Sequence, residues 1–201
     1  MIRNVVFDMG NVLIRYDPIH FVERTGIGRP EDRKALLEAI FFSPEWPRMD
    51  RGDLDEPELE VIVRRRLPAR LHGVAHKLIF SWEKPMEPIP GMADFARDCK
   101  KAGLGVYLLS NASRRQPEYW SDIPGSECFD GAVISALLRL TKPDAAIYRA
   151  LLAQYHLNAA ECLFIDDMPV NVAGAIDAGM QGIVFDGDVA ALRRAVFGGE
   201  P

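Results

Sequence analysis

The residue with the clearest capacity for chemistry is Asp8, a carboxylate that directly follows the apolar run Val5–Phe7. That run predicts a strand buried on both faces, as the central strands of parallel sheets are. Gly10-Asn11 is a turn signal, so the strand should end near Asp8, at the sheet edge where ligands bind in open α/β folds. A carboxylate there can act as a nucleophile or as a ligand of a hard metal ion, but it can also simply cap a turn.

Two other predicted strands also end in polar side chains. Ser110-Asn111 ends one of them and Asp166-Asp167 ends the other, while Lys142 stands just ahead of a predicted helix. If the strands are adjacent and parallel, these groups meet the first carboxylate at one edge. Singly, an Asp can cap a helix, a Ser can occupy a turn and a Lys can be solvated. Their joint placement favours a functional site.

The chemistry that suits these groups is phosphoryl transfer. Asp8 and Asp167 supply hard oxygen ligands for Mg²⁺, which bridges to phosphate in many enzymes. Ser110 and Lys142 offer a hydroxyl donor and a positive charge to phosphate oxygens. Asp8 could attack the phosphorus and form an aspartyl-phosphate that water then hydrolyses.

The elements that must position these groups alternate along the chain. Apolar runs predict strands at residues 5–7, 105–109, 132–135, 162–165 and 182–185, and amphipathic patterns predict helices at 92–102, 143–156, 170–178 and 189–197. Alternation at this spacing implies right-handed βαβ crossovers. The predicted fold class is α/β, a Rossmann-like three-layer sandwich with a mostly parallel sheet. The last residues, 198–201, are expected to form a loose tail.

Residues 16–84 have a different pattern. Helices are predicted near 18–24, 30–42, 57–66 and 71–82, and no strand pattern occurs between them. We interpret this block as a small all-helical cap inserted into the main domain. The stiff run Pro85–Gly91 then marks the return to that domain. The predicted core is therefore residues 1–15 and 85–201, and the predicted cap is residues 16–84.

Composition limits the class of protein. The chain has 201 residues, 48% hydrophobic and 26% charged, with a formal net charge of −5. This charge argues against a general nucleic-acid binder, and no apolar run approaches the length of about 20 residues that spans a bilayer. Three scattered cysteines and the lack of a signal-peptide pattern predict a reduced, cytoplasmic protein. The expected partner is a small phosphorylated metabolite, and the oligomeric state is left open.

Four segments resemble the motifs of the haloacid dehalogenase-like (HAD) hydrolase superfamily. They are Phe-Asp-Met-Gly-Asn-Val at residues 7–12, Leu-Ser-Asn at 109–111, Thr-Lys-Pro-Asp at 141–144 and Ile-Asp-Asp-Met-Pro-Val-Asn at 165–171. They occur in the superfamily's order and span nearly the whole chain. The helical block lies where subfamily I members carry their C1 cap.

The resemblance implies a magnesium-dependent phosphatase and a role for each site residue. The implied roles are Asp8 as nucleophile, Ser110 and Asn111 as phosphate-loop residues, Lys142 as charge stabiliser, Asp167 as direct metal ligand and Asp166 as a ligand through water.

Gly10 departs from the pattern of the superfamily's phosphatases, which usually carry a second Asp at this position as general acid and base. The backbone carbonyl of Gly10 can still bind magnesium, but it cannot protonate a leaving group. The loss of such help typically costs about 10²–10⁴-fold in rate. The Asp-x-Gly-Asn-Val form and Arg51–Leu54 resemble bacterial α-D-glucose-1-phosphate phosphatases and the phosphatase domain of epoxide hydrolases. We therefore expect a small sugar phosphate, such as a hexose 1-phosphate, whose acidic anomeric hydroxyl needs less protonation.

Two other functions stay open. A 2-haloacid dehalogenase also has a nucleophilic Asp without the second carboxylate, but it needs no magnesium and leaves Asp166-Asp167 without a purpose. A catalytically weak member that binds a phosphorylated ligand or a protein partner would explain Gly10, although Asp8 and Lys142 are both present.

Residues in the cap give weaker signals. Asp17, Arg48 and Arg51 are candidates for substrate contacts. Trp46 and Trp82 are expected to pack in the core or at the hinge.

Overall fold

The computed structural model describes residues 1–198, so most of the predicted tail lies outside the described residues. Its five strands form one sheet in the order β3-β2-β1-β4-β5, and every neighbouring pair is parallel. The strands are β1 (Asn4–Phe7), β2 (Gly105–Ser110), β3 (Gly131–Ile134), β4 (Cys162–Asp166) and β5 (Gln181–Val184). The parallel sheet predicted from the alternating pattern is confirmed, and β1 lies at its centre between β2 and β4.

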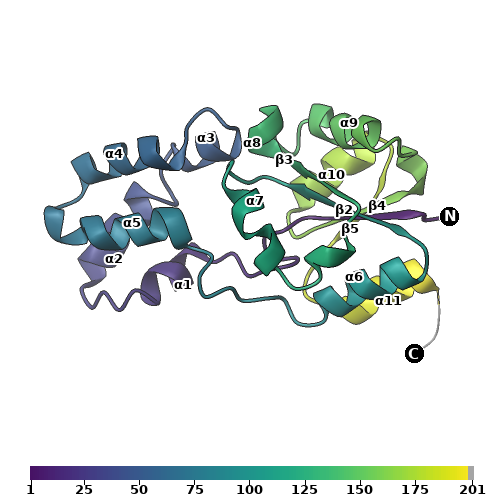
Figure 1. Ribbon diagram of the computed structural model, residues 1–201, viewed down its shortest axis with the longest axis horizontal. Coiled ribbons are helices and arrows are strands. Elements are labelled where there is room, and N and C mark those ends of the chain that lie inside the picture. Colours follow the sequence, from purple (N-terminus) through teal and green to yellow (C-terminus); the bar gives the residue numbers. More distant parts are fainter. Residues whose placement is uncertain (199–201) are drawn as a thin grey trace.

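Helices cover both faces of this sheet and make the three layers seen in Figure 1. One face carries α6 (Met92–Lys101) and α11 (Val189–Phe197), and the other carries α9 (Ala145–Gln154) and α10 (Pro169–Asp177). Because side chains alternate along a strand, Phe7 packs into the first hydrophobic cluster while Val6 packs into the second. This alternation explains why β1 is apolar at every buried position.

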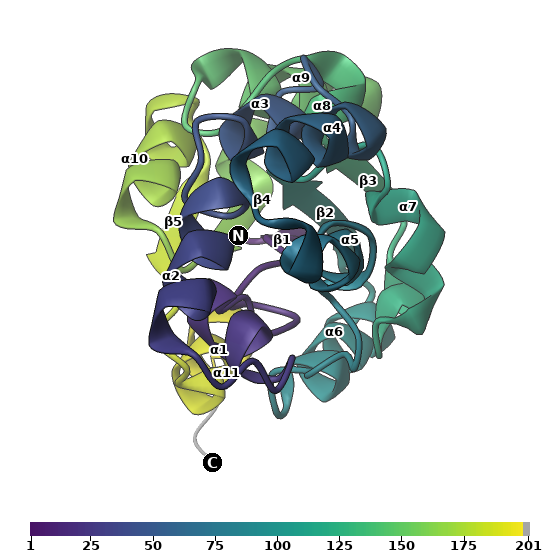
Figure 2. The same cartoon turned by 90° about the vertical axis from the view of Figure 1, so that its left-hand side faces the viewer.

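Residues 16–84, which we call the cap segment, form a group of helices beyond the carboxyl ends of the strands (Figure 1). They are α1 (Pro18–Glu23), α2 (Pro30–Ala39), α3 (Trp46–Asp50), α4 (Glu56–Arg66) and α5 (His72–Ser81). The segment contains no strand, as predicted. Figure 2 looks onto these helices with the sheet behind them.

Several predicted helix boundaries were wrong. The helix that begins at Pro30 ends at Ala39, not Phe42, because the backbone of Ile40 leaves the helical region at φ −112° and ψ −85°. Helix α3 was not predicted, since its five residues are too few to show a period. The described residues also include two short helices and four single turns of 3₁₀ helix. These are α7 (Gln116–Tyr119), α8 (Ser135–Leu138), Ala69–Leu71, Trp120–Asp122, Ser126–Cys128 and Ala159–Glu161.

The two chain segments that join the cap segment to the sheet run side by side. Ile14 forms a bridge with Pro88, and the Arg15 N–H donates to the Glu87 carbonyl at 2.8 Å. The Glu87 carboxylate also pairs with Arg24 at 2.8 Å. The turn after β1 is thereby fixed against the returning chain. Among residues 1–198, no helix has the length and hydrophobicity needed to cross a membrane.

Candidate active site

The carboxyl ends of β1 and β4 bring two carboxylates around one ammonium group. Phe7 pairs with Ile165 in the parallel register, so Asp8 and Asp166 follow at the same level of the sheet. Lys142 Nζ lies 2.7 Å from Asp8 Oδ1 and 2.7 Å from Asp166 Oδ2. All three side chains are buried. The sequence placed these groups at one edge, and the structure confirms that they meet.

Burial and charge shift the pKa values in this cluster. Burial raises the pKa of Asp8 to about 6, although the Lys142 ammonium opposes the rise. Burial alone would lower the pKa of Lys142, but the carboxylates of Asp8 and Asp166 outweigh it and raise that pKa. Burial is also the main reason why the pKa of Asp167 is raised. Lys142 is therefore a permanently charged group that keeps Asp8 more acidic than its burial alone would.

Neighbouring side chains and backbone groups fix the two carboxylates that end β4. Asp166 accepts from Asn171 Nδ2 at 3.0 and 3.1 Å and from the Met168 N–H at 2.8 Å. Asn11 Nδ2 donates to Asp167 Oδ2 at 3.0 Å, from a left-handed backbone position with φ 54°. Asn11 and Asn171 were not predicted as site residues. The sequence could have indicated both residues, because each belongs to one of the four motif segments.

The two polar residues after β2 have different positions. Asn111 lines the same cavity as Asp8, and its side-chain amide bonds to the Lys142 N–H at 2.8 Å and to the Lys142 carbonyl at 3.0 Å. It therefore positions the backbone that carries the ammonium. Ser110 is buried at the end of β2 and is not among the residues that line the cavity. Its predicted contact with phosphate stays a prediction.

The three carboxylates form a group that fits a magnesium ion. Asp8, Asp166 and Asp167 each offer an oxygen, and these oxygens lie within 4.8 Å of one another. If all three are ionised, the single charge of Lys142 leaves them two negative charges in excess, which a divalent cation would balance. Hard oxygen donors of this kind are the ligands that Mg²⁺ prefers. Gly10, whose carbonyl was predicted to bind the metal, lines the same cavity as Asp8 and Asp167.

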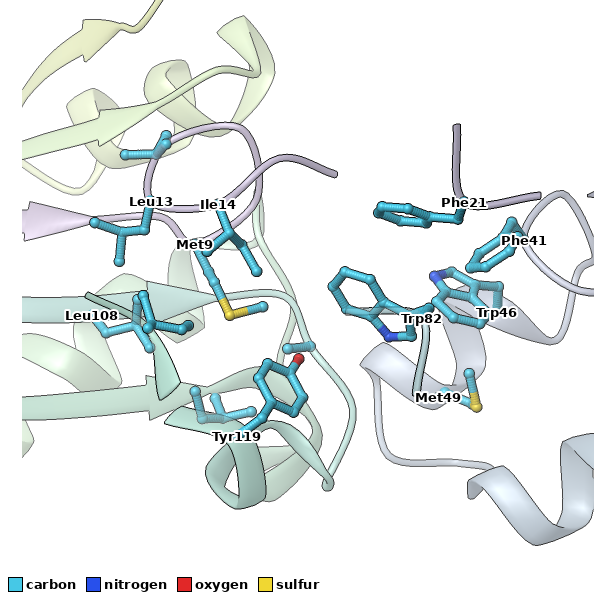
Figure 3. Close-up of a cluster of buried hydrophobic side chains, with 14 of the residues drawn as sticks. Met9, Leu13, Ile14, Phe21, Phe41, Trp46, Met49, Trp82, Leu108 and Tyr119 are labelled. Carbon is cyan, nitrogen blue, oxygen red and sulfur yellow. The ribbon is translucent and has the colours of Figure 1, made fainter. Parts of the chain in front are cut away.

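A cavity of about 350 Å³ extends from Asp8 and Asp167 to the cap segment. Its far side, which we call the cap wall, is made by seven residues of the cap segment. They are Tyr16, Trp46, Met49, Asp50, Glu56, Ile79 and Trp82. Figure 3 shows aromatic rings from the cap segment, including Trp46 and Trp82, facing Met9 and Tyr119 of the sheet side.

The end of this cavity at the strand ends is lined by Asp8, Asn111, Lys142 and Asp167, and we call it the phosphate end after the ligand that the sequence predicts. The sequence identified this end better than the cap wall. None of Asp17, Arg48 and Arg51 lines the cavity. Asp17 caps α1 and pairs with Arg15 at 2.8 Å, and Arg51 pairs with Asp53. Their predicted contacts with the substrate stay predictions, and the cavity lining gives them no support.

Trp46 and Trp82 are packing residues, as predicted, and they also line the cavity. The missed signal was the spacing of Trp46, Met49 and Asp50 at i, i+3 and i+4, which places them on one face of α3.

Backbone contacts join α3 and the loop after it to the sheet. The Ser135 hydroxyl donates to the Asp50 carbonyl, and Arg114 donates to the Gly52 carbonyl at 2.9 Å. A Cβ added at Gly52 would lie 2.3 Å from the Ala136 carbonyl oxygen, and Gly52 has φ +74°. Only glycine fits this junction without a shift of the backbone.

Ion pairs and hydrogen bonds add a second junction. The Arg115 guanidinium donates two hydrogen bonds, at 2.6 and 3.1 Å, to the buried Glu83 carboxylate. Glu56 accepts from the Ser113 hydroxyl and lies 3.9 Å from Arg115 Nε. The cap wall is thereby positioned relative to the strand ends.

Comparisons with known proteins agree with this geometry. A family model described as haloacid dehalogenase-like hydrolase matches residues 2–179. Flavin mononucleotide hydrolase 1 of Arabidopsis thaliana is 40% identical over 188 residues, which cover 90% of this chain and 71% of that protein. A sesquiterpene phosphatase of Aspergillus oryzae is 27% identical over 190 residues, covering 90% of this chain and 88% of that protein.

Solved structures share the fold. A HAD family enzyme from Bacteroides thetaiotaomicron, in complex with magnesium and inorganic phosphate, has a TM-score of 0.70 and 19% identity, covering 96% of this chain and 99% of that one. An L-2-haloacid dehalogenase from Xanthobacter autotrophicus has a TM-score of 0.65 and 17% identity, covering 100% of this chain and 84% of that one.

Proposed function

Since this chain belongs to the haloacid dehalogenase-like hydrolases, we propose that it is a Mg²⁺-dependent phosphomonoester hydrolase that acts through an aspartyl-phosphate at Asp8. The observation that supports this most is the Lys142 ammonium, which lies 2.7 Å from Asp8 while the three carboxylates converge beside it. A buried nucleophile next to a fixed cation is suited to an anionic substrate. Relatives that are named phosphatase or hydrolase of a phosphate ester support the same reading.

The reaction assigns a task to each residue. A carboxylate oxygen of Asp8 attacks the phosphorus, the bond from phosphorus to the alcohol oxygen breaks, and the leaving alkoxide takes a proton from water, since Gly10 has no carboxyl group to supply one. Water then attacks the aspartyl-phosphate and releases phosphate, which restores Asp8. Lys142 would stabilise the negative charge on the phosphate oxygens, and Asn111 would hold Lys142 in place. Magnesium, held by Asp8, Asp167 and the Gly10 carbonyl with Asp166 through water, would supply further charge neutralisation.

The substrate is not fixed by the family, because one scaffold carries many activities. The sequence predicts a sugar phosphate such as a hexose 1-phosphate, since Gly10 lacks a carboxyl group that could protonate the leaving oxygen. The two relatives are named for a flavin nucleotide and a sesquiterpene, which are larger and more apolar than a hexose. A small phosphorylated metabolite is the common element. Cytoplasmic location stays a prediction from the sequence.

The test is phosphate release from a panel of esters that includes glucose 1-phosphate, glucose 6-phosphate and flavin mononucleotide, with Mg²⁺ and with EDTA. We expect release that EDTA abolishes. Asp8→Asn keeps the size of the side chain and removes the nucleophile, so turnover should fall by about 10⁴-fold or more while the fold is retained. Unchanged release from this variant would exclude the mechanism. Equal rates on both glucose phosphates would count against a need for an acidic leaving group.

Two alternatives predict other outcomes. A 2-haloacid dehalogenase would release halide from 2-haloacids in the presence of EDTA, and Gly10 together with the shared fold is the observation in its favour. A binding protein would take up phosphate esters tightly and release no phosphate. Asp166 and Asp167 at the metal-fitting group favour the phosphatase over both.

A further inference from the structure

The cap wall differs in chemistry from the phosphate end of the cavity, and this difference indicates which alcohol the substrate carries. The aromatic rings of the cap wall come from Tyr16, Trp46 and Trp82, and Tyr119 faces them from the sheet side. Met49 and Ile79 add apolar surface. A site of this kind gains affinity from a flat apolar group placed against the rings.

A second layer of aromatic residues holds these rings in place. Trp46 packs on Phe41 with ring centroids 4.6 Å apart, and Trp82 packs on Phe21 at 5.2 Å. Tyr16 meets Trp82 edge-to-face at 5.3 Å. Because the rings are already ordered, a ligand that covers them loses little free energy in arranging them.

The charges of the cap wall are negative. Asp50 and Glu56 line it, and Lys142 is the one cation among the lining residues that the structure describes. Lys142 is already engaged by two carboxylates at the phosphate end. A second anionic group on the substrate would therefore meet carboxylates without a cation to balance it.

The two cap-wall carboxylates are not equivalent. Glu56 accepts from Ser113 and lies near Arg115, whereas the Asp50 carboxyl has no hydrogen-bond partner within residues 1–198. Burial, with the charge of Asp8 as the next cause, raises the pKa of Asp50 to about 7. The oxygens of Asp50 are thus available to a donor on the substrate, and the site already disfavours added negative charge.

We propose that the cap wall binds the alcohol of the substrate as a flat aromatic ring joined to the phosphate through a linker that carries hydroxyl groups, and that it rejects alcohols with a second anionic group. This rests on the proposed phosphatase function. A hexose would satisfy Asp50 and leave the rings uncovered. An aliphatic chain would cover the rings and leave the Asp50 carboxyl without a donor, which is costly for a polar group that is removed from water.

The experiment uses two matched pairs of substrates with the full chain and Mg²⁺. Adenosine 5′-monophosphate and ribose 5-phosphate share the scissile bond and differ by the ring. We expect kcat/KM about 10- to 100-fold higher with the ring, the range that base stacking on aromatic side chains gives. Glucose 1-phosphate and glucose 1,6-bisphosphate differ by one anionic group, and we expect kcat/KM at least about 10-fold lower for the bisphosphate.

Variants connect these preferences to residues. Trp46→Leu should bring the ratio of kcat/KM for adenosine 5′-monophosphate to kcat/KM for ribose 5-phosphate towards one. Trp120→Leu removes a tryptophan that does not line the cavity and should keep the ratio. Asp50→Asn should reduce, by several-fold, the ratio of kcat/KM for glucose 1-phosphate to kcat/KM for glucose 1,6-bisphosphate. Equal kcat/KM for the adenosine and ribose esters would overturn the ring assignment, and an unchanged bisphosphate gap in Asp50→Asn would overturn the role of that carboxylate.

A second measurement separates this inference from the proposed function. If no ester, including p-nitrophenyl phosphate, is hydrolysed, the phosphatase function fails. Binding of adenosine and of ribose to Asp8→Asn is then followed by tryptophan fluorescence. Adenosine that binds at least about 10-fold more tightly than ribose, with this difference reduced in Trp46→Leu, supports the aromatic site, and equal affinities overturn it.

Discussion

The two ends of the cavity differ in whether their polar side chains already have partners. At the phosphate end each described carboxylate has a partner: Lys142 holds Asp8 and Asp166, and Asn11 holds Asp167. At the cap wall the surface is mainly aromatic, and the Asp50 carboxyl has no hydrogen-bond partner among the described side chains. At the first end the side chains already bind one another before a substrate arrives, whereas the second end has an acceptor that a substrate can satisfy.

The difference follows from what supports each end. The phosphate end stands on adjacent parallel strands whose backbone pairing sets the distances between side chains. The cap wall stands on helices and loops that join the sheet through side-chain packing and through polar contacts such as those of Gly52 and Arg115. In the function that we propose, the reaction would therefore take place on the sheet scaffold and the inserted segment would select the substrate, as loops and insertions commonly do.

The largest expected effect is at the phosphate end. Lys142→Met leaves Asp8 and Asp166 buried without a cation, and the loss of one partner from a buried ion pair costs about 3–5 kcal/mol. Phosphate release should be lost as well. The measurement is urea unfolding in EDTA, so that bound metal does not replace the ammonium. Lys100→Met, which breaks an exposed pair with Asp130, is the control and should cost less than about 1 kcal/mol. Equal losses in the two variants would contradict a special role for the buried cation.

A smaller effect is expected at the junction between the ends. Gly52 and Gly26 both have φ +74°, but only an added Cβ at Gly52 meets another atom, the Ala136 carbonyl oxygen at 2.3 Å. Gly26→Ala should cost about 1–2 kcal/mol in unfolding free energy from its left-handed backbone alone. Gly52→Ala should cost about 1–2 kcal/mol more and should raise KM, because the loop between Asp50 and Glu56 must move. Similar unfolding and unchanged KM in the two variants would show that this junction does not position the cap wall.

The smallest effect is at the cap wall and depends on pH. The pKa of Asp50 is about 7 in the folded protein, above its ordinary value of 3.8. Between these values the folded protein binds a proton that the unfolded chain has lost, so stability falls as pH rises through this window. Asp50→Asn cannot ionise and so avoids this loss of stability. Its free energy of unfolding should exceed that of the wild type by about 1–3 kcal/mol at pH 8, with little difference at pH 4.

The measurement for Asp50→Asn is urea unfolding at both pH values in EDTA. Asp53→Asn alters a carboxylate of the same loop that pairs with Arg51, and it should show no gain at pH 8. A gain for Asp50→Asn that is equal at both pH values would mean that the ionised carboxyl is not the cause.

The sequence alone determined the scaffold and its reactive edge. Apolar runs that end in Asp8, Ser110 and Asp166 predicted parallel strands whose carboxyl ends meet, and the observed register confirms this. Such features are local: a strand needs only a short apolar run, and parallel pairing brings the strand ends together.

Only the tertiary structure decided which partners the site side chains bind and which residues line the cavity. Asn171 turned out to hold Asp166, while the predicted phosphate residue Ser110 is not part of the cavity lining. Asp50, Glu56 and Trp82 come from separate parts of the cap segment, and no period or spacing connects them. They meet because the helices of the cap segment pack against one another and against the strand ends, and such non-local packing leaves no signal in a short window of sequence.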